Sequence, residues 1–275
     1  MRIALCNEVI REMPLAEQAV FAATLGYDGL ELAPFTLDAE RPHRLGDARL
    51  ASIRRDVEAA GLSVSGIHWL LVAPEGLSIT TPDAGVRNAT LEVMKGLVDQ
   101  CAALGGSYLI HGSPGQRSLD PGDEADGRKR AGEYFAAAAE RAEAAGVTYC
   151  VEPLSPRMTN FVTSLAEAAT IVEDVDSPAF TSMLDTSAAA AGETATIPDL
   201  LNRHLADGLV AHVHFNDPNK QGPGQGEMNF APIMATLLEA GYERWIGIEP
   251  FVYEPDGPAS AARAIGYVRG LVDAV

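Results

Sequence analysis

The sequence predicts an α/β protein that folds as a single (β/α)₈ TIM barrel over residues 1–275, and three observations support this. Short apolar runs alternate with alanine-rich helical stretches along the chain, which is typical of βα units around a parallel sheet. Eight such runs occur, the number that closes a barrel of about 250 residues. Four of them end in a carboxylate or histidine, at intervals of 33, 29 and 35 residues.

The elements follow in order along the chain. The expected strands are 2–7, 28–32, 63–69, 107–111, 147–152, 180–185, 210–215 and 245–249. The expected helices are 15–24, 47–60, 84–103, 127–145, 164–174, 196–206, 229–240 and 258–273. Several helices begin after a capping residue or with a proline in the first turn. Gly61 and Gly146 each follow Glu-Ala-Ala, where a helix can end in the left-handed conformation before the next strand.

Composition and charge restrict the class of protein. Hydrophobic residues make up 47% and charged residues 21%, as in a globular protein with a large core. The net charge of −18 repels phosphate backbones, so nucleic acid is not an expected partner. The apolar runs are too short to span a bilayer, and the chain starts with a strand-like segment, so we expect a cytoplasmic protein without a membrane partner. The three cysteines are expected to be reduced core thiols.

The four polar residues at strand ends are Glu152, Asp185, His214 and Glu249. The carboxyl ends of barrel strands meet at one mouth, so these side chains are expected to share one site. Three carboxylates and one imidazole suit a single divalent cation. We expect Mn²⁺ first, with Mg²⁺, Co²⁺, Fe²⁺ and Zn²⁺ as alternatives.

Such a site suggests proton-transfer chemistry on a sugar. A cation bound to a carbonyl and the adjacent hydroxyl acidifies the neighbouring C–H and stabilises an enediolate. One glutamate can remove the proton from one face and the other can return it to the opposite face. Glu152 and Glu249 are the candidates for this acid/base pair.

Several segments resemble the sugar phosphate isomerase/epimerase superfamily, the xylose isomerase-like barrels that include ketose 3-epimerases, hydroxypyruvate isomerase, inosose-pathway enzymes and endonuclease IV. The ketose 3-epimerase and hydroxypyruvate isomerase branch is the most similar. For the epimerases, the resemblance implies Mn²⁺ or a similar ion on the four residues, with the two glutamates as acid and base. It places Lys220 where they have a substrate-binding arginine, and it implies a homodimer or homotetramer. The segments are 151–154, 183–186, 212–217, 222–226 and 248–251.

The chain departs from that pattern at two positions. Where the epimerases carry a substrate-contacting histidine and a second glutamate, this sequence has Ala188 and Met158. A free hexulose in the same pose would leave hydroxyls unpaired, so ketose 3-epimerase activity in the strict sense is not expected. Endonuclease IV is excluded as a functional relative, because its extra histidine and its Asp-x-His pair are absent and the net charge is strongly negative.

Further residues are candidates for binding substrate. His68 and His111 end the third and fourth strands, and a barrel-rim histidine tied to a carboxylate is the alternative for both. Trp69 can supply an apolar wall or pack in the interior. His212 is assigned to the opposite face of its strand from His214, in a structural role. Loops 71–82, 112–126 and 216–227 are expected to cover a small substrate. The remaining candidates are Asn7, Glu31 and Arg157.

The sequence therefore predicts a divalent-metal-dependent isomerase or epimerase that acts on a keto-sugar or related carbonyl compound through an enediolate. A metal-dependent lyase is the nearest alternative, because the same enolate can expel a substituent by β-elimination from a 3-keto glycoside. A barrel that binds a carbohydrate without turning it over is the second alternative.

Overall fold

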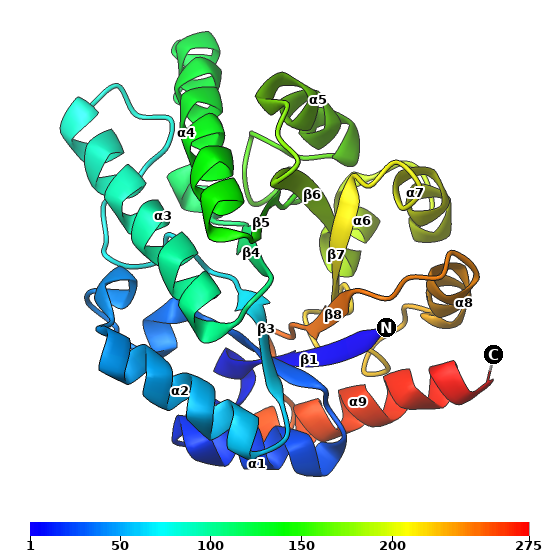
Figure 1. Ribbon diagram of the computed structural model, residues 1–275. Helices are drawn as coiled ribbons and strands as arrows, with labels where there is room; N and C mark the ends of the chain where they lie inside the picture. The colour runs from blue at the N-terminus through cyan, green and yellow to red at the C-terminus, as the bar shows by residue number, and fades with distance from the viewer. Residues whose placement is uncertain (275) are drawn as a thin grey trace.

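The computed structural model, described here for residues 1–274, is a closed eight-stranded parallel barrel surrounded by helices (Figure 1). Each strand pairs with the next along the chain, and β8 closes onto β1 from the pair Arg2–Trp245 to the pair Leu5–Ile248. The predicted fold class is confirmed. The strands are β1 (Arg2–Cys6), β2 (Gly29–Leu32), β3 (Ser63–Ile67), β4 (Tyr108–His111), β5 (Thr148–Val151), β6 (Phe180–Asp185), β7 (Val210–Phe215) and β8 (Trp245–Ile248).

The outer layer contains one α-helix more than the sequence predicts. The additional helix, α6 (Thr186–Gly192), starts directly after β6. The others are α1 (Leu15–Leu25), α2 (Asp47–Ala59), α3 (Ala84–Leu104), α4 (Glu124–Ala145), α5 (Leu165–Val175), α7 (Ile197–His204), α8 (Ala231–Glu239) and α9 (Gly257–Ala274). Within residues 1–274, four short 3₁₀ helices lie in loops: η1 (Asn7–Ile10), η2 (Pro34–Thr36), η3 (Pro42–Arg44) and η4 (Pro114–Gln116).

Local sequence signals explain where several helices begin and end. The side chains of Asp83, Ser164 and Thr196 accept hydrogen bonds from the first-turn amides of α3, α5 and α7, and such a cap contributes about 1 kcal/mol. The predicted left-handed glycines are present at Gly61 and Gly146, with φ of 80° and 71°. These caps set the short connections that bring each helix back onto the barrel.

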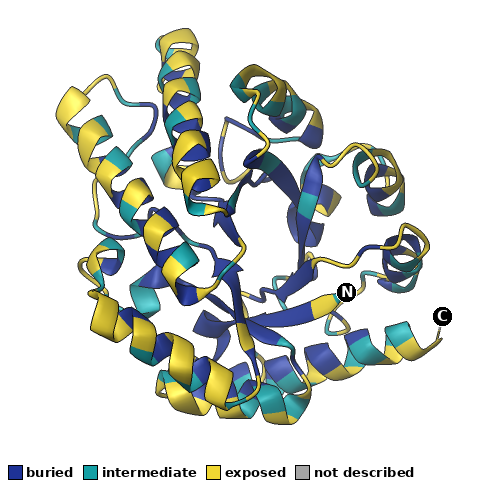
Figure 2. Ribbon diagram, viewed as in Figure 1, coloured by how far each residue is buried: buried dark blue, intermediate teal, exposed yellow. Residues whose placement is uncertain are grey.

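The core has two layers, and burial follows them (Figure 2). The strands are buried throughout most of their length, whereas each outer helix exposes one face to solvent. The larger apolar cluster lies between strands and helices. A smaller one fills the barrel and consists of Ala4, Tyr108, Ile110, Cys150, Met183 and Trp245. All three cysteines are buried and free, as expected.

The long loops hold one another in place. The Ile79 amide donates to the Gln116 carbonyl at 2.9 Å, and the Thr80 hydroxyl donates to the Ser118 carbonyl at 2.7 Å. Loops 71–82 and 112–126 are therefore hydrogen-bonded to each other. In loop 216–227, Gln225 Nε2 donates to the Ser260 carbonyl at 3.3 Å. The glycine-rich half of that loop therefore packs on α9. Among residues 1–274, no helix has the length and apolarity needed to cross a bilayer.

Candidate metal centre

Glu152, Asp185, His214 and Glu249 converge at the carboxyl ends of four consecutive strands. Glu152 and Glu249 directly follow β5 and β8, and Asp185 is the last residue of β6. Each offers one ligand atom, and these atoms all lie within 4.8 Å of one another. All four residues are buried, with exposed fractions of 0–7%. The spacing in sequence thus corresponds to proximity in space.

Asp185 is oriented by the helix that the sequence analysis missed. As the N-cap of α6, its Oδ1 accepts a hydrogen bond from the Ala188 amide at 2.6 Å. Its Oδ2 is buried and has no hydrogen-bond partner within residues 1–274. A buried carboxylate oxygen without a partner is costly, so a ligand at this position would compensate for it.

The two ring nitrogens of His214 have different surroundings. Nε2 lies 2.8 Å from Glu31 Oε1 in hydrogen-bonding geometry. Nδ1 lies 2.9 Å from Glu249 Oε2, but the direction of that contact makes no hydrogen bond. Although burial disfavours the charged ring, Glu249 and Glu31 raise the pKa of His214 well above its usual value. A cation in place of the Nδ1 proton would leave Nε2 to donate its proton to Glu31. This is the arrangement of a metal-binding histidine with a carboxylate behind it.

Crowding of carboxylates in a buried space has a clear electrostatic effect. Burial and the nearby charges of Glu249 and Asp185 raise the pKa of Glu152 to about 8. Burial and Glu249 also raise the pKa of Asp185 to about 6. A divalent cation would relieve this repulsion and return both groups to the ionised form. The site offers oxygen and nitrogen donors, and neither Asp185 Oδ2 nor His214 Nδ1 has a hydrogen-bond partner within residues 1–274. These features fit one hard or intermediate divalent ion.

Glu31 lies deeper in the barrel than the four residues and contacts the rings of two histidines. It is fully buried and contacts His214 and His212, with the His212 Nε2 to Glu31 Oε2 distance at 3.2 Å. Tyr108 also donates its hydroxyl proton to Glu31 Oε2 at 2.6 Å. Although burial favours the neutral acid, the two histidines hold the pKa of Glu31 well below its usual value. Glu31 is therefore an ionised positioning group rather than a residue free to contact substrate.

His68 connects this network to a carboxylate that the sequence analysis missed. Its Nε2 lies 3.0 Å from Glu8 Oε2 and 3.9 Å from Glu249 Oε1, and its Nδ1 lies 3.3 Å from Glu31 Oε1. Burial disfavours the charged ring, but the neighbouring carboxylates, Glu8 first, raise the pKa of His68 to about 9. A protonated His68 is a hydrogen-bond donor beside the candidate metal centre. Glu8 lies in η1, where no strand-end pattern marks it.

Two further buried residues fix the strand ends. Asn216 donates from Nδ2 to the Glu249 carbonyl at 3.1 Å, and its Oδ1 accepts from the Ser187 amide at 3.0 Å. Arg117 is fully buried and donates to the Glu152 carbonyl at 2.7 Å. Asn216 thus connects the carboxyl ends of β6, β7 and β8, and Arg117 connects the loop after β4 to the end of β5. Sequence gave no signal for Arg117 beyond its place in a long loop.

Glycines leave room for the buried charges. A Cβ at Gly247 in β8 would lie 2.7 Å from both Glu31 Oε2 and His214 Cδ2. A Cβ at Gly112, just after β4, would overlap Glu152 Oε2. The close approach of Glu31, His214 and Glu152 therefore requires glycine at both positions.

Aromatic side chains line one side of the mouth. The Trp69 ring meets Phe35 at 6.2 Å and Phe251 at 6.0 Å, both edge to face. Lys220 lies over the Phe251 ring with Nζ 5.5 Å from its centroid, and Nζ is 3.4 Å from Ser187 Oγ. Trp69 and Lys220 thus lie at the same end of the barrel as the four residues, close to the chain segments that carry Asp185 and Glu249.

The structure places two of the other candidates, His111 and Asn7, in contacts outside this site, and a third, Arg157, makes no ion pair within residues 1–274. His111 packs outward, with Nδ1 2.7 Å from the Tyr149 hydroxyl and its ring against Phe135 of α4. Asn7 uses both amide protons on Gln18 and Thr36 and accepts from the Ala33 amide, so it is a structural tie. Arg157 is exposed in the loop after β5.

The expected orientation of His212 was wrong. Residues two apart in a strand share a face, so His212 points into the barrel with His214, and their rings meet edge to face at 4.8 Å. His212 also stacks on Tyr108 at 4.1 Å. It supports Glu31 from below, which agrees with the structural role assigned to it.

Comparison with known proteins adds independent information. A family model described as a xylose isomerase-like TIM barrel matches residues 20–271. A D-psicose 3-epimerase from Agrobacterium fabrum is 28% identical over 239 residues, covering 84% of this chain and 77% of the relative. A putative hydroxypyruvate isomerase from Streptomyces coelicolor is 26% identical over 273 residues, covering 91% and 89%.

Solved structures share the architecture along almost the whole chain. A D-psicose 3-epimerase crystallised in the presence of D-fructose superposes with a TM-score of 0.82 at 21% identity, covering 99% of each chain. A 3-keto-D-glucoside 4-epimerase from E. coli superposes with a TM-score of 0.83 at 18% identity, covering 98% of this chain and 99% of the other. At these identities the likeness concerns the fold.

Proposed function

Because the chain belongs to the xylose isomerase-like TIM barrel family, we propose that it is a divalent-metal-dependent isomerase or epimerase of a keto-sugar or related carbonyl compound. One observation carries the proposal. Three carboxylates and one imidazole are buried within 4.8 Å of one another at the end of a barrel where such enzymes place their chemistry. The relatives named as D-psicose 3-epimerase and fructoselysine 3-epimerase support the class of reaction.

Glu152, Asp185, His214 and Glu249 would hold the cation, with Mn²⁺ as the proposed ion. Once bound, a divalent cation supplies Lewis acidity that makes the C–H beside a coordinated carbonyl easier to ionise. The hydrogen bond from the Ala188 amide of α6 fixes the orientation of the Asp185 carboxylate, and the contact with Glu31 fixes the orientation of the His214 ring. The residues therefore need little rearrangement to bind the ion.

Glu152 and Glu249 are the proposed acid/base pair. They follow β5 and β8, which are separated in the barrel by β6 and β7, so the two carboxylates approach the site from different sides. One can accept a proton from the substrate carbon while the other, protonated, can return one to the opposite face. His68, with Nε2 toward Glu8 and Nδ1 toward Glu31, would hold these carboxylates in place beside the site.

The mouth favours a substrate with an apolar or bulky end. Ala188 and Met158 offer no hydrogen bond, and Met158 is 41% exposed. Trp69 and Phe251 form an apolar wall, with Lys220 beside it as a cation. A free hexulose would find few polar partners there, whereas a substituted keto-sugar could place its substituent on this wall.

The apolar wall also favours a second candidate function, β-elimination from a 3-keto glycoside. Proton removal beside the carbonyl generates an enolate, and loss of the substituent at the next carbon competes with reprotonation. The same residues would abstract the proton in both reactions. The products differ, because epimerisation conserves the mass of the sugar and elimination releases the aglycone.

Solvent-deuterium exchange tests the proposal. Mn²⁺-loaded protein in D₂O, incubated with ketoses and 3-keto glycosides, is expected to place deuterium at the carbon beside the carbonyl, or to release an aglycone. Glu152→Gln and Glu249→Gln should each lower the rate by at least about a hundredfold, because each removes one acid/base group. Glu173→Gln changes an exposed glutamate and serves as the matched control. Sugar binding without exchange or release in the wild type would instead support a non-catalytic carbohydrate-binding barrel.

A further inference from the structure

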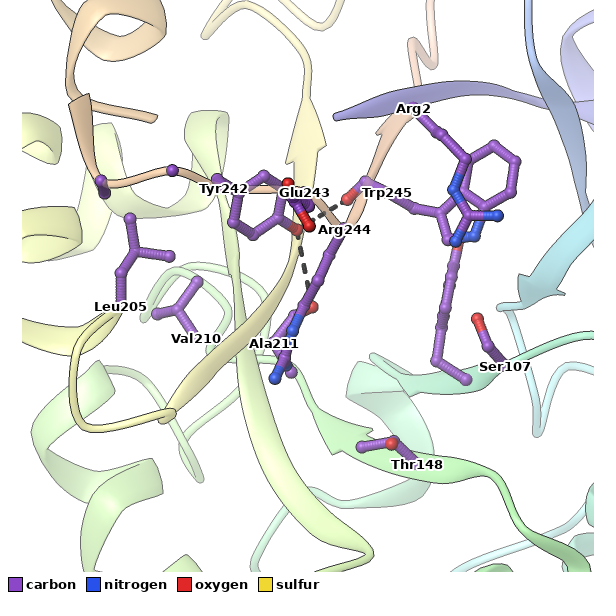
Figure 3. A pocket seen from close by; sticks show the side chains of 13 residues that line it. Arg2, Ser107, Thr148, Leu205, Val210, Ala211, Tyr242, Glu243, Arg244 and Trp245 are labelled. Carbon is purple, nitrogen blue, oxygen red and sulfur yellow. Dashed lines mark hydrogen bonds between the residues drawn. The ribbon is translucent and has the colours of Figure 1, made fainter. Parts of the chain in front are cut away.

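A cavity, here called the basal cavity, lies at the opposite end of the barrel from the candidate metal centre (Figure 3). Its volume is about 540 Å³, within the range of small-molecule sites. It is lined by the first residues of β1, β5, β7 and β8 and by the turn before β8. Nothing in the proposed chemistry at the mouth uses it.

Two arginines contribute to this cavity from adjacent strand starts. The Arg2 amide donates to the Arg244 carbonyl at 3.1 Å, so the barrel closure fixes the two backbones side by side. The Arg2 guanidinium lies over the Trp245 ring, 4.1 Å from its centroid. In Figure 3, Arg244 extends across the opening toward Ala211. Both arginines thus line the basal cavity, Arg2 on the Trp245 side and Arg244 on the Ala211 side.

Neither arginine is neutralised by a neighbouring side chain. Within residues 1–274, no carboxylate lies within ion-pair distance of Arg2 or Arg244. By contrast, Arg54, Arg128 and Arg141 each pair with an acidic residue. In a chain with a net charge of −18, two unpaired arginines at one cavity mark a local positive site.

The other lining residues fit an anion with an organic portion. Leu205, Val210 and the Tyr242 ring provide apolar contact. Thr148 has a hydroxyl that donates no hydrogen bond to any other residue of the described chain. Glu243 is the single carboxylate among the lining residues, and it is exposed. Charge, hydroxyl and apolar surface thus occur together.

The basal cavity is separate from the candidate metal centre. The inner cluster, which includes Tyr108, Cys150, Met183 and Trp245, fills the barrel between the two ends. Tyr108 and Trp245 contribute to both this cluster and the cavity wall. A ligand in the basal cavity would therefore not contact the residues proposed to hold the cation.

We propose that the basal cavity is a binding site for a small organic anion, one that carries a phosphate or paired carboxylates. Guanidinium groups match both through paired, charge-assisted hydrogen bonds. The apolar lining and the volume favour an organic anion over inorganic phosphate alone. Arg2 and Arg244 bind the charged group, and Trp245 holds Arg2 in place.

Calorimetric titration of the Mn²⁺-loaded protein tests whether the basal cavity binds an organic anion. The probes are glucose 6-phosphate, tartrate and inorganic phosphate, and sodium chloride at matched ionic strength is the blank. Saturable binding of glucose 6-phosphate or tartrate, tighter than that of inorganic phosphate, is expected, and the stronger of the two identifies the anion class. Arg2→Gln and Arg244→Gln should each weaken it about tenfold, as expected for loss of a charge-assisted pair. Glu243→Gln should strengthen it by removing repulsion.

Two controls locate the site. Arg49→Gln removes an exposed, unpaired arginine on α2 and should leave the affinity unchanged. Asp185→Ala disrupts the candidate metal centre and should also leave it unchanged. Absence of saturable binding, insensitivity to both basal arginine variants, or loss of binding in Asp185→Ala would each overturn the proposal. None of these results depends on whether the mouth catalyses exchange.

Discussion

At the scale of single residues, His214 shows how one contact prepares another. Glu31 can accept the proton on Nε2, and Nδ1 lies on the side of Glu249, 2.9 Å from its Oε2. Histidine ligands depend on such a partner, since it sets both the tautomer and the ring orientation.

Glu31→Gln should therefore weaken Mn²⁺ binding by about 10- to 100-fold, because a neutral amide no longer holds the Nε2 proton as strongly. The measurement is the Kd for Mn²⁺ by calorimetry. Glu173→Gln, an exposed glutamate on α5, is the control. An unchanged Kd in folded Glu31→Gln protein would show that Glu31 does not position the ligand.

His111 illustrates a buried neutral histidine. Burial, with a smaller contribution from Arg117, lowers its pKa to about 3. The unfolded chain binds a proton near pH 6.5, so between about pH 6.5 and 3 it holds more protons than the folded chain. Stability from this group is therefore present above pH 6.5 and lost as the pH falls through that window.

His111→Phe keeps an aromatic ring but removes the titration. Between pH 7 and pH 5 the variant should lose about 2 kcal/mol less unfolding free energy than the wild type. Urea unfolding at the two pH values measures the difference. Equal losses in both proteins would mean that His111 is not held neutral in the fold.

Residue spacing along the chain was enough to predict the four-residue cluster, because the carboxyl ends of barrel strands converge regardless of the length and conformation of the loops. It was not enough for His68 and His111. His68 follows β3 and His111 ends β4, yet His68 faces the mouth and His111 faces α4, since residues at a strand end can lie on either side of the pleat. Glu8 was missed because it belongs to a short 3₁₀ turn rather than to a strand end.

At the scale of elements, β8 shows a constraint of space. Gly247 faces the barrel interior, where Glu31 and His214 pass within 2.7 Å of the position a Cβ would occupy. The neighbours are a buried carboxylate and its histidine partner, and neither can move aside for a Cβ without breaking their contact.

Gly247→Ala should lower the thermal midpoint and weaken Mn²⁺ binding, with a cost of about 1–3 kcal/mol from overpacking. Gly270→Ala in α9 is the matched control, because a Cβ there meets open space and alanine favours a helix. A Gly247→Ala protein as stable as the wild type and with the same affinity for Mn²⁺ would contradict the packing argument.

Elements with a clear period and caps were predicted to within a few residues, as for α5, which Ser164 caps, and β6, which ends at Asp185. The helix α6 was not predicted. It is only seven residues long and starts without a break from the strand, with Asp185 serving both as its cap and as a candidate ligand. Because Asp185 was already interpreted as a strand-end ligand, its position in the sequence did not also indicate the start of a helix.

At the scale of the whole molecule, a chain with a net charge of −18 concentrates three buried carboxylates in one place. That arrangement costs folding free energy unless protons or a cation neutralise it, and the raised pKa of Glu152 and Asp185 reflects this cost. Removing one of the four candidate ligands should therefore weaken the binding of a cation.

The metal content of purified protein tests the central claim most directly. After saturation with Mn²⁺ and gel filtration, elemental analysis should find one ion per chain in the wild type and none in Asp185→Ala. Asp185→Asn, which retains a side-chain oxygen for the α6 cap, separates loss of the ligand from loss of the fold. No bound ion at saturating Mn²⁺, Mg²⁺, Co²⁺ or Zn²⁺, or equal content in wild type and both variants, would contradict the four-residue metal site.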